Sequence, residues 1–283
     1  MKQKILTLQT LYREGQIQLK DSGIEEYQLD AWYLLEYVTG ISKASYYGDP
    51  NRELSAAQAE EYRKCIEKRS ERIPLQHITG VQEFMGHEFF VNEHVLIPRQ
   101  DTEILVEHAL DKVEDGKKVL DMCTGSGCIL LSILKRYQVQ GTGADISSEA
   151  LQVAERNRKH LALPQVEWLQ SDLFEKIEEK YEVIVSNPPY IQTGVIESLQ
   201  EEVRLHDPYI ALDGKEDGLY FYRRIIEDAK AYLEDGGWLL FEIGYDQAEP
   251  VTRLMEQAGY SEIHVKKDLS GLDRVAGARY NKN

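Results

Sequence analysis

Cysteine is scarce in this sequence, with only Cys65, Cys123 and Cys128 among its 283 residues. An odd number of widely spaced cysteines does not suit a disulfide framework, and no cysteine or histidine spacing is typical of a metal site. Unpaired cysteines are commonly small buried groups. We therefore expect three buried thiols, no disulfide and no bound metal.

Long apolar runs are also missing, because no stretch approaches the roughly 18–20 apolar residues of a membrane-spanning helix. The N-terminal segment MKQKILTLQTLYREGQ is too polar for a signal peptide. Hydrophobic residues nevertheless make up 42% of the chain, enough for the cores of two modest domains. We expect a cytoplasmic protein with no membrane attachment.

Basic side chains are outnumbered, since 33 lysines and arginines accompany 49 aspartates and glutamates, for a formal charge of −16. Such a chain is repelled by phosphate backbones unless it carries a local basic patch. The imbalance disfavours non-specific binding of nucleic acid and suits a basic protein partner. We expect no direct nucleic-acid partner.

The first part of the chain, to about residue 75, shows helical periodicity and no strand pattern. Ser55 and Gln58 have the spacing of a capping box, which predicts a charged helix from there to about Ser70. An earlier amphipathic helix should end at Gly40, and its run includes Leu29, Trp32, Tyr33 and Tyr37. We expect a small helical domain over residues 1–78.

The remainder changes from a hairpin pattern to alternating strands and helices. Aromatic and branched residues around Gly86 and Asn92 predict a β-hairpin, and we assign residues 79–99 to a hairpin linker. Over residues 100–283, repeated strand–helix units predict a mostly parallel sheet with helices on both faces. The expected strands are 118–122, 142–146, 166–170, 183–186, 238–243, 263–267 and 274–278; the expected helices are 128–137, 148–160, 218–233 and 247–257.

A glycine-containing loop follows the first of these strands. Asp121 precedes the loop Met122-Cys123-Thr124-Gly125-Ser126-Gly127. In an open α/β sheet, ligands bind at the carboxyl ends of strands, and glycines allow close approach. Leu130 stands where a dinucleotide fingerprint needs glycine, and a phosphate loop's Gly-Lys-Ser/Thr is absent. The loop suits a ligand with a carboxylate, although a plain strand–helix turn is also compatible with this pattern.

Acidic residues end the next two strands. Asp145 is placed to accept both ribose hydroxyls, and Asp172 to accept from an adenine amino group, while Leu173 or Phe174 covers the ring. Singly, these acids also fit a helix start or a solvated turn. Together with Asp121 they form a set, one strand–helix unit apart, that fits a nucleoside without phosphate. S-adenosylmethionine is such a molecule.

The fourth strand ends in Asn187-Pro188-Pro189-Tyr190. Each proline has a fixed φ and no N–H, so this is a rigid corner that displays the Asn187 side-chain oxygen and the Pro188 carbonyl. Two acceptors at fixed spacing match the hydrogens of a planar NH₂ group, and Tyr190 offers a ring for stacking. The corner predicts methylation of a planar nitrogen; the alternative is a proline-rich turn that merely ends a strand.

These residues resemble the PrmC/HemK family of peptide chain release factor glutamine methyltransferases. The Asn-Pro-Pro-Tyr corner is shared with DNA adenine methyltransferases. The segments 74–80 (PLQHITG) and 97–103 (IPRQDTE) are more particular to this family. The resemblance covers most of the chain and extends through 241–244 (FEIG).

The resemblance implies a function and a site. The substrate would be the glutamine of the Gly-Gly-Gln motif in bacterial class I release factors, methylated at N5 by a monomeric enzyme whose helical domain recognises the substrate. The fold would be a Rossmann-like class I methyltransferase sheet with an antiparallel last strand. The catalytic residues would be Asn187, Pro188 and Tyr190, with Pro189 as a further substrate contact. The cofactor contacts would be Cys123, Thr124, Gly125, Ser126, Gly127, Asp145, Asp172, Leu173 and Asn187.

One residue departs from the family pattern, and some alternatives stay open. The family usually has glycine where this chain has Cys123, which is tolerable if φ there is negative. Arg99, Asp101 and Glu103 fit either the substrate entrance or a helix-start ion-pair cluster; Glu242 and Arg274 fit either a pair or two strand ends. N6-adenine methylation of DNA or rRNA is the alternative function, but the net charge and the lack of a basic insert disfavour it.

Overall fold

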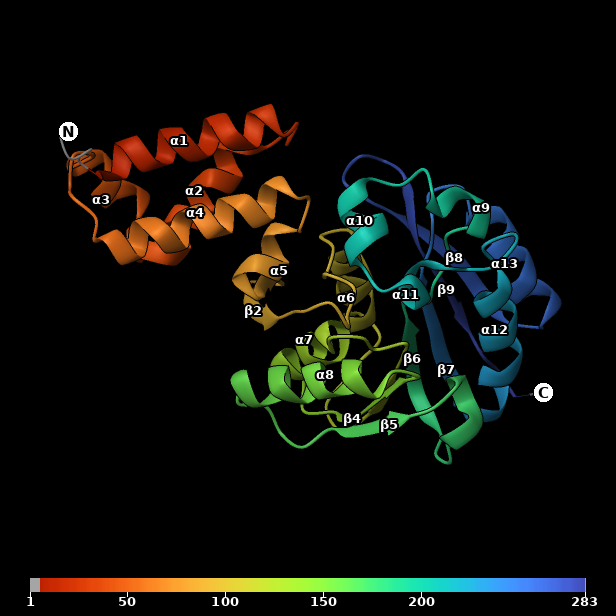
Figure 1. Ribbon diagram of the computed structural model, residues 1–283. Coiled ribbons are helices and arrows are strands. Elements are labelled where there is room, and N and C mark those ends of the chain that lie inside the picture. Colours follow the sequence, from red (N-terminus) through yellow and green to blue (C-terminus); the bar gives the residue numbers. More distant parts are fainter. Residues whose placement is uncertain (1–5, 283) are drawn as a thin grey trace. The chain divides into compact units, whose positions relative to one another are not determined.

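The computed structural model describes residues 6–282, and the chain divides between Gly80 and Val81 into two compact units (Figure 1). In the described residues no helix is both long and apolar enough to cross a membrane. Each unit has its own hydrophobic core.

The N-terminal unit is helical, as predicted. The capping box at Ser55 is present in both directions, and Gly40 ends its helix in the left-handed conformation with φ 67°. The helices are α1 (Leu8–Asp21), α2 (Tyr27–Thr39), α3 (Lys43–Gly48), α4 (Ala56–Ser70) and α5 (Leu75–Thr79).

The buried face of α2 differs from the predicted one. Of the four predicted apolar positions only Trp32 is buried, whereas Leu29, Tyr33 and Tyr37 are exposed. The buried positions are Asp30, Ala31, Trp32, Leu34 and Leu35. Asp30 is tolerated inside because Arg69 donates to its carboxylate at 2.7 Å. The pattern of apolar residues alone therefore does not predict which face of α2 is buried.

The second unit begins with the expected hairpin, formed by β1 (Val81–Phe84) and β2 (His87–Phe90). Met85 and Gly86 both have positive φ, as a tight two-residue hairpin turn requires. The strands end at Phe90, so the hairpin is shorter than predicted. Fully buried Asn157 ties it to the sheet domain, because its Oδ1 accepts from the Phe90 N–H and its Nδ2 donates to the Ser126 carbonyl.

The sheet of the second unit has seven strands in the order β5-β4-β3-β6-β7-β9-β8 (Figure 1). Only β9 runs antiparallel to its neighbours, so the predicted mostly parallel sheet with an antiparallel last strand is confirmed. The strands are β3 (Lys118–Met122), β4 (Gln140–Asp145), β5 (Glu167–Gln170), β6 (Tyr181–Ser186), β7 (Leu233–Glu242), β8 (Ser261–Lys267) and β9 (Asp273–Arg279).

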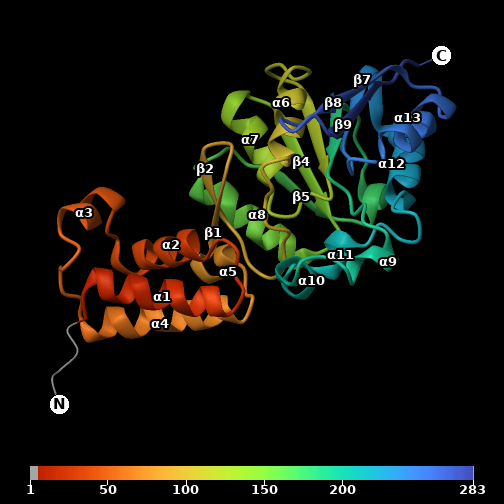
Figure 2. The ribbon, with the colours of Figure 1, turned by 90° about the horizontal axis from the view of Figure 1, so that it is seen from above.

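Helices cover both faces of the sheet and build two cores. One core gathers α12 (Tyr220–Tyr232) and α13 (Ala248–Gln257), and the other gathers α6 (Thr102–Leu110) and α7 (Cys128–Arg136), next to α8 (Ser148–His160). Short helices not predicted from the sequence follow β6 and lie at one end of this unit (Figure 2). They are α9 (Thr193–Ile196), α10 (Glu201–His206) and α11 (Tyr209–Leu212); a 3₁₀ turn η1 (Leu173–Lys176) follows β5.

A fully buried carboxyl group fastens the loop after β3. The Oδ2 atom of Asp121 accepts from the Thr124 hydroxyl at 2.6 Å and from the Leu130 N–H at 3.3 Å. Burial is the main cause that raises the pKa of Asp121 from 3.8 to about 7. The folded protein therefore favours the neutral form of Asp121. The free energy of unfolding that this neutral side chain contributes is fully present below pH 3.8 and is lost as pH rises through about 7.

Replacing this acid by a neutral amide should therefore change how stability depends on pH. Relative to wild type, Asp121→Asn should gain free energy of unfolding as pH rises from about 4 to about 8, because wild type must then bury a charge. Urea unfolding across that range measures the difference, with exposed Asp228→Asn as a control for removing one carboxylate. A difference that stays constant with pH would show that Asp121 is not the titrating group.

Candidate active site

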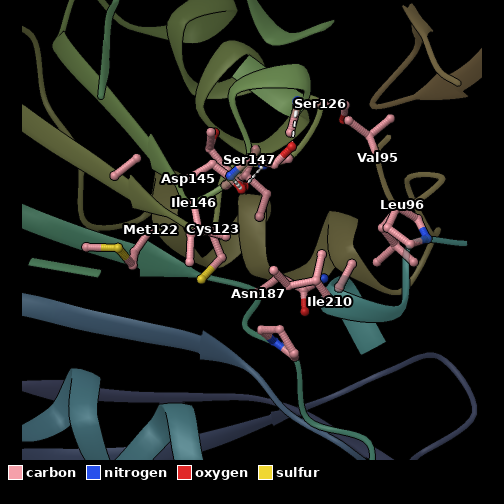
Figure 3. A pocket seen from close by; sticks show the side chains of 18 of the residues that line it. Val95, Leu96, Met122, Cys123, Ser126, Asp145, Ile146, Ser147, Asn187 and Ile210 are labelled. Carbon is pink, nitrogen blue, oxygen red and sulfur yellow. Dashed lines mark hydrogen bonds between the residues drawn. The ribbon is translucent and has the colours of Figure 1, made fainter. Parts of the chain in front are cut away.

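A cavity opens at the carboxyl ends of the parallel strands, where the strand order reverses between β3 and β6 (Figure 3). This switch point is where open α/β sheets bind ligands. The space inside it, together with the open solvent at its mouth, is about 1010 Å³. Its lining comes from residues 94–96, 98, 99, 102, 122–126, 128, 129, 144–147, 150, 171–173, 187, 189, 208, 210, 211 and 221.

The loop after β3 is held in an unusual backbone conformation. Cys123, Gly125 and Gly127 all have positive φ, of 61°, 55° and 78°. The negative φ that would make a cysteine easy to accommodate here is therefore not present, and Cys123 adopts the left-handed region at a steric cost of about 1–2 kcal/mol. Gly127 does not line the cavity; a Cβ there would come within 3.1 Å of Ala154. Gly127 thus serves the close packing of α7 behind the loop.

The Cys123 side chain faces the cavity, as Figure 3 shows. It is half-buried, whereas Cys65 and Cys128 are buried, so the expectation of three buried thiols holds fully for those two. Burial raises the pKa of the Cys123 thiol well above its ordinary range, and nearby Asp145 adds to the rise. The sulfur beside the cavity therefore stays protonated and weakly nucleophilic at neutral pH.

Asp145 ends β4 and lines the cavity. Its Oδ2 accepts from the Gly125 N–H at 2.8 Å, and its Oδ1 accepts from the Ser147 N–H at 2.9 Å. Burial raises the pKa of Asp145, while these backbone donors oppose the rise. The carboxylate thus fixes the glycine loop and still presents lone pairs to the cavity, since each oxygen can accept more than one hydrogen bond.

The third expected acid is arranged differently. Asp172 lines the cavity, but its Oδ1 accepts from Arg224 at 3.0 Å and its side chain is 40% exposed. Leu173 is buried, lines the cavity and has φ 49°, a conformation that a leucine adopts only under tertiary constraint. Asp121 does not line the cavity at all. Of the three predicted acids, Asp145 and Asp172 therefore line the cavity, whereas Asp121 lies beneath the loop.

The Asn-Pro-Pro-Tyr corner directly follows β6. Asn187 and Pro189 line the cavity, whereas Pro188 and Tyr190 are not part of its wall. Tyr190 packs partly buried against the core, and its hydroxyl donates to Glu242 Oε1 at 3.1 Å. Burial, and after it the nearby Glu242 side chain, raises the pKa of Tyr190 well above its usual value. Its ring is thus anchored at one edge, and its predicted stacking role stays a prediction.

A buried polar cluster lies beneath this corner. Thr102 Oγ1 donates to Glu242 Oε2 at 2.6 Å, and Asn187 Nδ2 donates to the same Thr102 oxygen at 3.4 Å. Glu242 and Thr102 are each 2% exposed, and burial raises the pKa of Glu242 against the opposing effect of these hydroxyl donors. Thr102 is a residue that sequence reasoning missed, because nothing local distinguishes it from an ordinary helix start.

The open alternatives around 97–103 resolve into ion pairs. Arg274 pairs with Asp101 and Asp268 at 3.1 and 3.2 Å, whereas the side-chain oxygens of Glu242 accept from Thr102 and Tyr190. Arg99 lines the cavity and donates to Asp207 at 2.7 Å. Glu103 accepts from the Met85 N–H at 2.6 Å, tying α6 to the hairpin. Of the three helix-start residues, only Arg99 therefore reaches the cavity.

An apolar wall completes the site and was also missed. Pro208, Ile210 and Ala211, in the short helices after β6, line the cavity together with Phe221. Ile210 is half-exposed at the mouth (Figure 3). The only sequence signal was an apolar stretch after a proline without strand or helix period. Within residues 6–282 no group of three metal-ligating side chains forms a metal site.

The arrangement has a definite chemical character. A glycine loop, a carboxylate with lone pairs left to accept hydrogen bonds and an apolar wall suit a nucleoside. Arg99, which also lines the cavity, is paired with Asp207. Asn187 presents an amide at the other side of the same space (Figure 3). The site can therefore bind a nucleoside beside a group that is held by hydrogen bonds to Asn187.

Comparison with known proteins places this site in a family. The PrmC N-terminal domain model matches residues 10–80, and the methyltransferase small domain model matches residues 99–204. The fold is similar to a methyltransferase from Pyrococcus furiosus, with a TM-score of 0.56 at 17% identity over 76% of this chain and 100% of that one.

Curated relatives match more than nine tenths of the chain. A release factor glutamine methyltransferase from Geobacter sulfurreducens is 40% identical over 92% of both chains. Another from Clostridium acetobutylicum is 42% identical over 91% of this chain and 93% of its own. With this identity over nearly the full length of both chains, and with the site described above, the protein belongs to the release factor glutamine methyltransferase family.

Proposed function

We propose that this protein transfers a methyl group from S-adenosylmethionine to N5 of the glutamine in the Gly-Gly-Gln motif of bacterial class I release factors. The observation that carries the proposal is Asn187 in the wall of the cavity that Asp145 and Asp172 also line, in a chain that is 40% identical to a release factor glutamine methyltransferase over 92% of its length. The acidic charge of −16 gives no support to the alternative, methylation of adenine in nucleic acid.

The cavity residues fit S-adenosylmethionine. Asp145 can accept the ribose hydroxyls through lone pairs that its two backbone contacts leave open. Asp172 can accept the adenine amino group through the oxygen that does not meet Arg224, and Leu173 covers the ring. The backbone of the loop from Cys123 to Ser126 is left for the methionine portion, with Gly127 supporting the loop from outside the cavity.

The corner residues do the positioning. Bound S-adenosylmethionine supplies a methyl group on a positively charged sulfur, a strong electrophile. Asn187 Oδ1 and the Pro188 carbonyl accept the two N–H hydrogens of the substrate amide, which points the nitrogen lone pair along one line. They also stabilise the positive charge that grows on that nitrogen. The fixed φ of both prolines keeps these acceptors in place without reorganisation.

No residue has to remove a proton beforehand, because the extra proton can leave after transfer. The residues must instead keep competing nucleophiles and water away. The neutral thiol of Cys123 is a poor competitor, since burial keeps its pKa high. The apolar wall at Ile210 and Phe221 limits water on the side of the cavity mouth.

We further propose how the remaining parts contribute. Residues 1–78 would form the substrate-recognition domain, residues 79–99 a linker and residues 100–283 the catalytic domain. Exposed aromatic residues on the helical unit, Tyr33, Tyr37 and Tyr47, support a protein-binding role, because aromatic side chains are enriched in interfaces. We propose a monomer that meets its release factor in the cytoplasm without contacting nucleic acid.

Purified protein with radiolabelled S-adenosylmethionine should label a bacterial class I release factor and leave DNA and rRNA unlabelled. A release factor with the target glutamine replaced by alanine is the matched control and should stay unlabelled. Labelled nucleic acid in place of release factor would favour the adenine alternative.

Asn187→Ala should abolish turnover while leaving cofactor affinity measurable. We expect kcat to fall by about 100-fold or more, as for loss of one preorganised polar contact to the developing charge. Isothermal titration with S-adenosylmethionine should show a Kd raised by no more than about tenfold, the effect of one lost hydrogen bond. Turnover retained in this variant would remove the assigned role of the corner.

Substitutions at Cys123 should separate backbone strain from side-chain chemistry. Cys123→Gly removes the left-handed steric cost and should bind S-adenosylmethionine within about threefold of wild type. Cys123→Val should weaken binding by about tenfold, because a β-branched residue hardly adopts φ near 61° and would shift the loop. Equal affinity of the valine and glycine variants would mean that the loop tolerates other conformations.

A further inference from the structure

Asn187, Thr102 and Glu242 meet although they come from three elements. Asn187 follows β6, Thr102 begins α6 and Glu242 ends β7. The contacts form a chain, with Asn187 Nδ2 3.4 Å from Thr102 Oγ1 and Thr102 Oγ1 2.6 Å from Glu242 Oε2. Asn187 belongs to the cavity wall, and Glu242 is almost fully buried behind it.

The direction of each hydrogen bond in this chain follows from the available hydrogens. A threonine hydroxyl has one hydrogen, and a carboxylate is purely an acceptor. Both oxygens of the Glu242 side chain face hydroxyl donors, Tyr190 at Oε1 and Thr102 at Oε2, so the short 2.6 Å contact takes the Thr102 hydrogen. The Thr102 oxygen can then only accept from Asn187, so the group that faces it must be the NH₂ end of the amide.

This direction decides what the other end of the Asn187 amide offers. With NH₂ turned to Thr102, the carbonyl oxygen Oδ1 is the end left for the substrate. The reverse rotamer would present NH₂ to a substrate NH₂, so that neither could accept. The two rotamers have nearly the same shape, and the protein therefore needs a polar contact to distinguish them.

We propose that Thr102 and Glu242 are positioning residues that fix the side-chain amide of Asn187 with its oxygen toward the methyl-accepting nitrogen. This rests on the proposed function and deepens it by assigning the origin of the acceptor at the corner. Glu242 acts from behind, through Thr102, and touches neither substrate nor cofactor. Its other oxygen accepts from Tyr190, so one buried carboxylate holds both ends of the corner.

The cleanest test compares two variants of Thr102. Thr102→Ser keeps the hydroxyl and should retain kcat within about threefold. Thr102→Val has nearly the same shape but no hydroxyl, so Asn187 loses its fixed acceptor. We expect kcat to fall by about 10- to 100-fold, with the KM for release factor changed by no more than about threefold, because the lost interaction matters most as charge develops.

A double-mutant cycle tests the link to Glu242. Glu242→Met removes the acceptor and frees the Thr102 hydrogen to turn toward Asn187, so kcat should again fall by about 10- to 100-fold. Thr102→Val combined with Glu242→Met should be no slower than the slower single variant, because both act through the same amide. Tyr222→Phe is the matched control: its hydroxyl donates to the Glu242 backbone carbonyl, not to the carboxylate, so kcat should stay within about threefold.

The outcomes separate this proposal from the proposed function. Thermal unfolding identifies variants that lose activity only because they are unstable. The comparison of kcat between Thr102→Val and Thr102→Ser then decides whether the hydroxyl positions Asn187. Equal kcat for these two, or multiplying losses in the cycle, would overturn the positioning role while release factor methylation stands. If wild type instead labels nucleic acid, the proposed function falls, and the same kcat ratios on that substrate still decide the positioning role.

Discussion

The rest of the site depends on one constraint, the parallel pairing of strand β6 with strand β3. Met122 and Ser186 are partners in register at the carboxyl ends of these two parallel strands, and the Ser186 hydroxyl donates to the Met122 carbonyl at 2.7 Å. The next residue on each strand is therefore Cys123 on one side and Asn187 on the other. Because the chain then turns in opposite directions from these strands, the loop and the corner enclose a common space rather than stacking on each other.

Buried carboxyl groups stabilise the irregular backbone around that space. Asp121 binds the loop from beneath, Asp145 binds it from the neighbouring strand, and Glu242 binds the corner from behind. Asp121 and Glu242 are almost fully buried and Asp145 is half-buried, at a cost that their hydrogen bonds offset, and burial raises the pKa of all three. Fixed acceptors therefore replace solvent as partners for strained loops, which keeps the site preorganised.

The sequence predicted those features of the fold and the site that follow from local periodicity. Alternating apolar strands and helices are local signals, and the parallel sheet and the corner after its fourth strand followed from them. The face of α2 could not be predicted, because Asp30 is buried only through its pairing with distant Arg69. The positive φ of Cys123 and the contact of Thr102 with Glu242 likewise depend on tertiary packing, which no spacing in the sequence records.

The corner alone does not select a substrate, since any planar NH₂ group satisfies two acceptors. Selection must come from what surrounds it, and the short helices after β6 are the part of the wall nearest the mouth that carries exposed apolar residues. Leu205, Tyr209 and Ile210 are each more than half exposed there. This apolar rim of Leu205, Tyr209 and Ile210 gains energy when a folded protein loop covers it and gains little from a phosphate backbone. The same rigid corner is thereby directed to a glutamine side chain by the chemistry of its rim rather than by its own geometry.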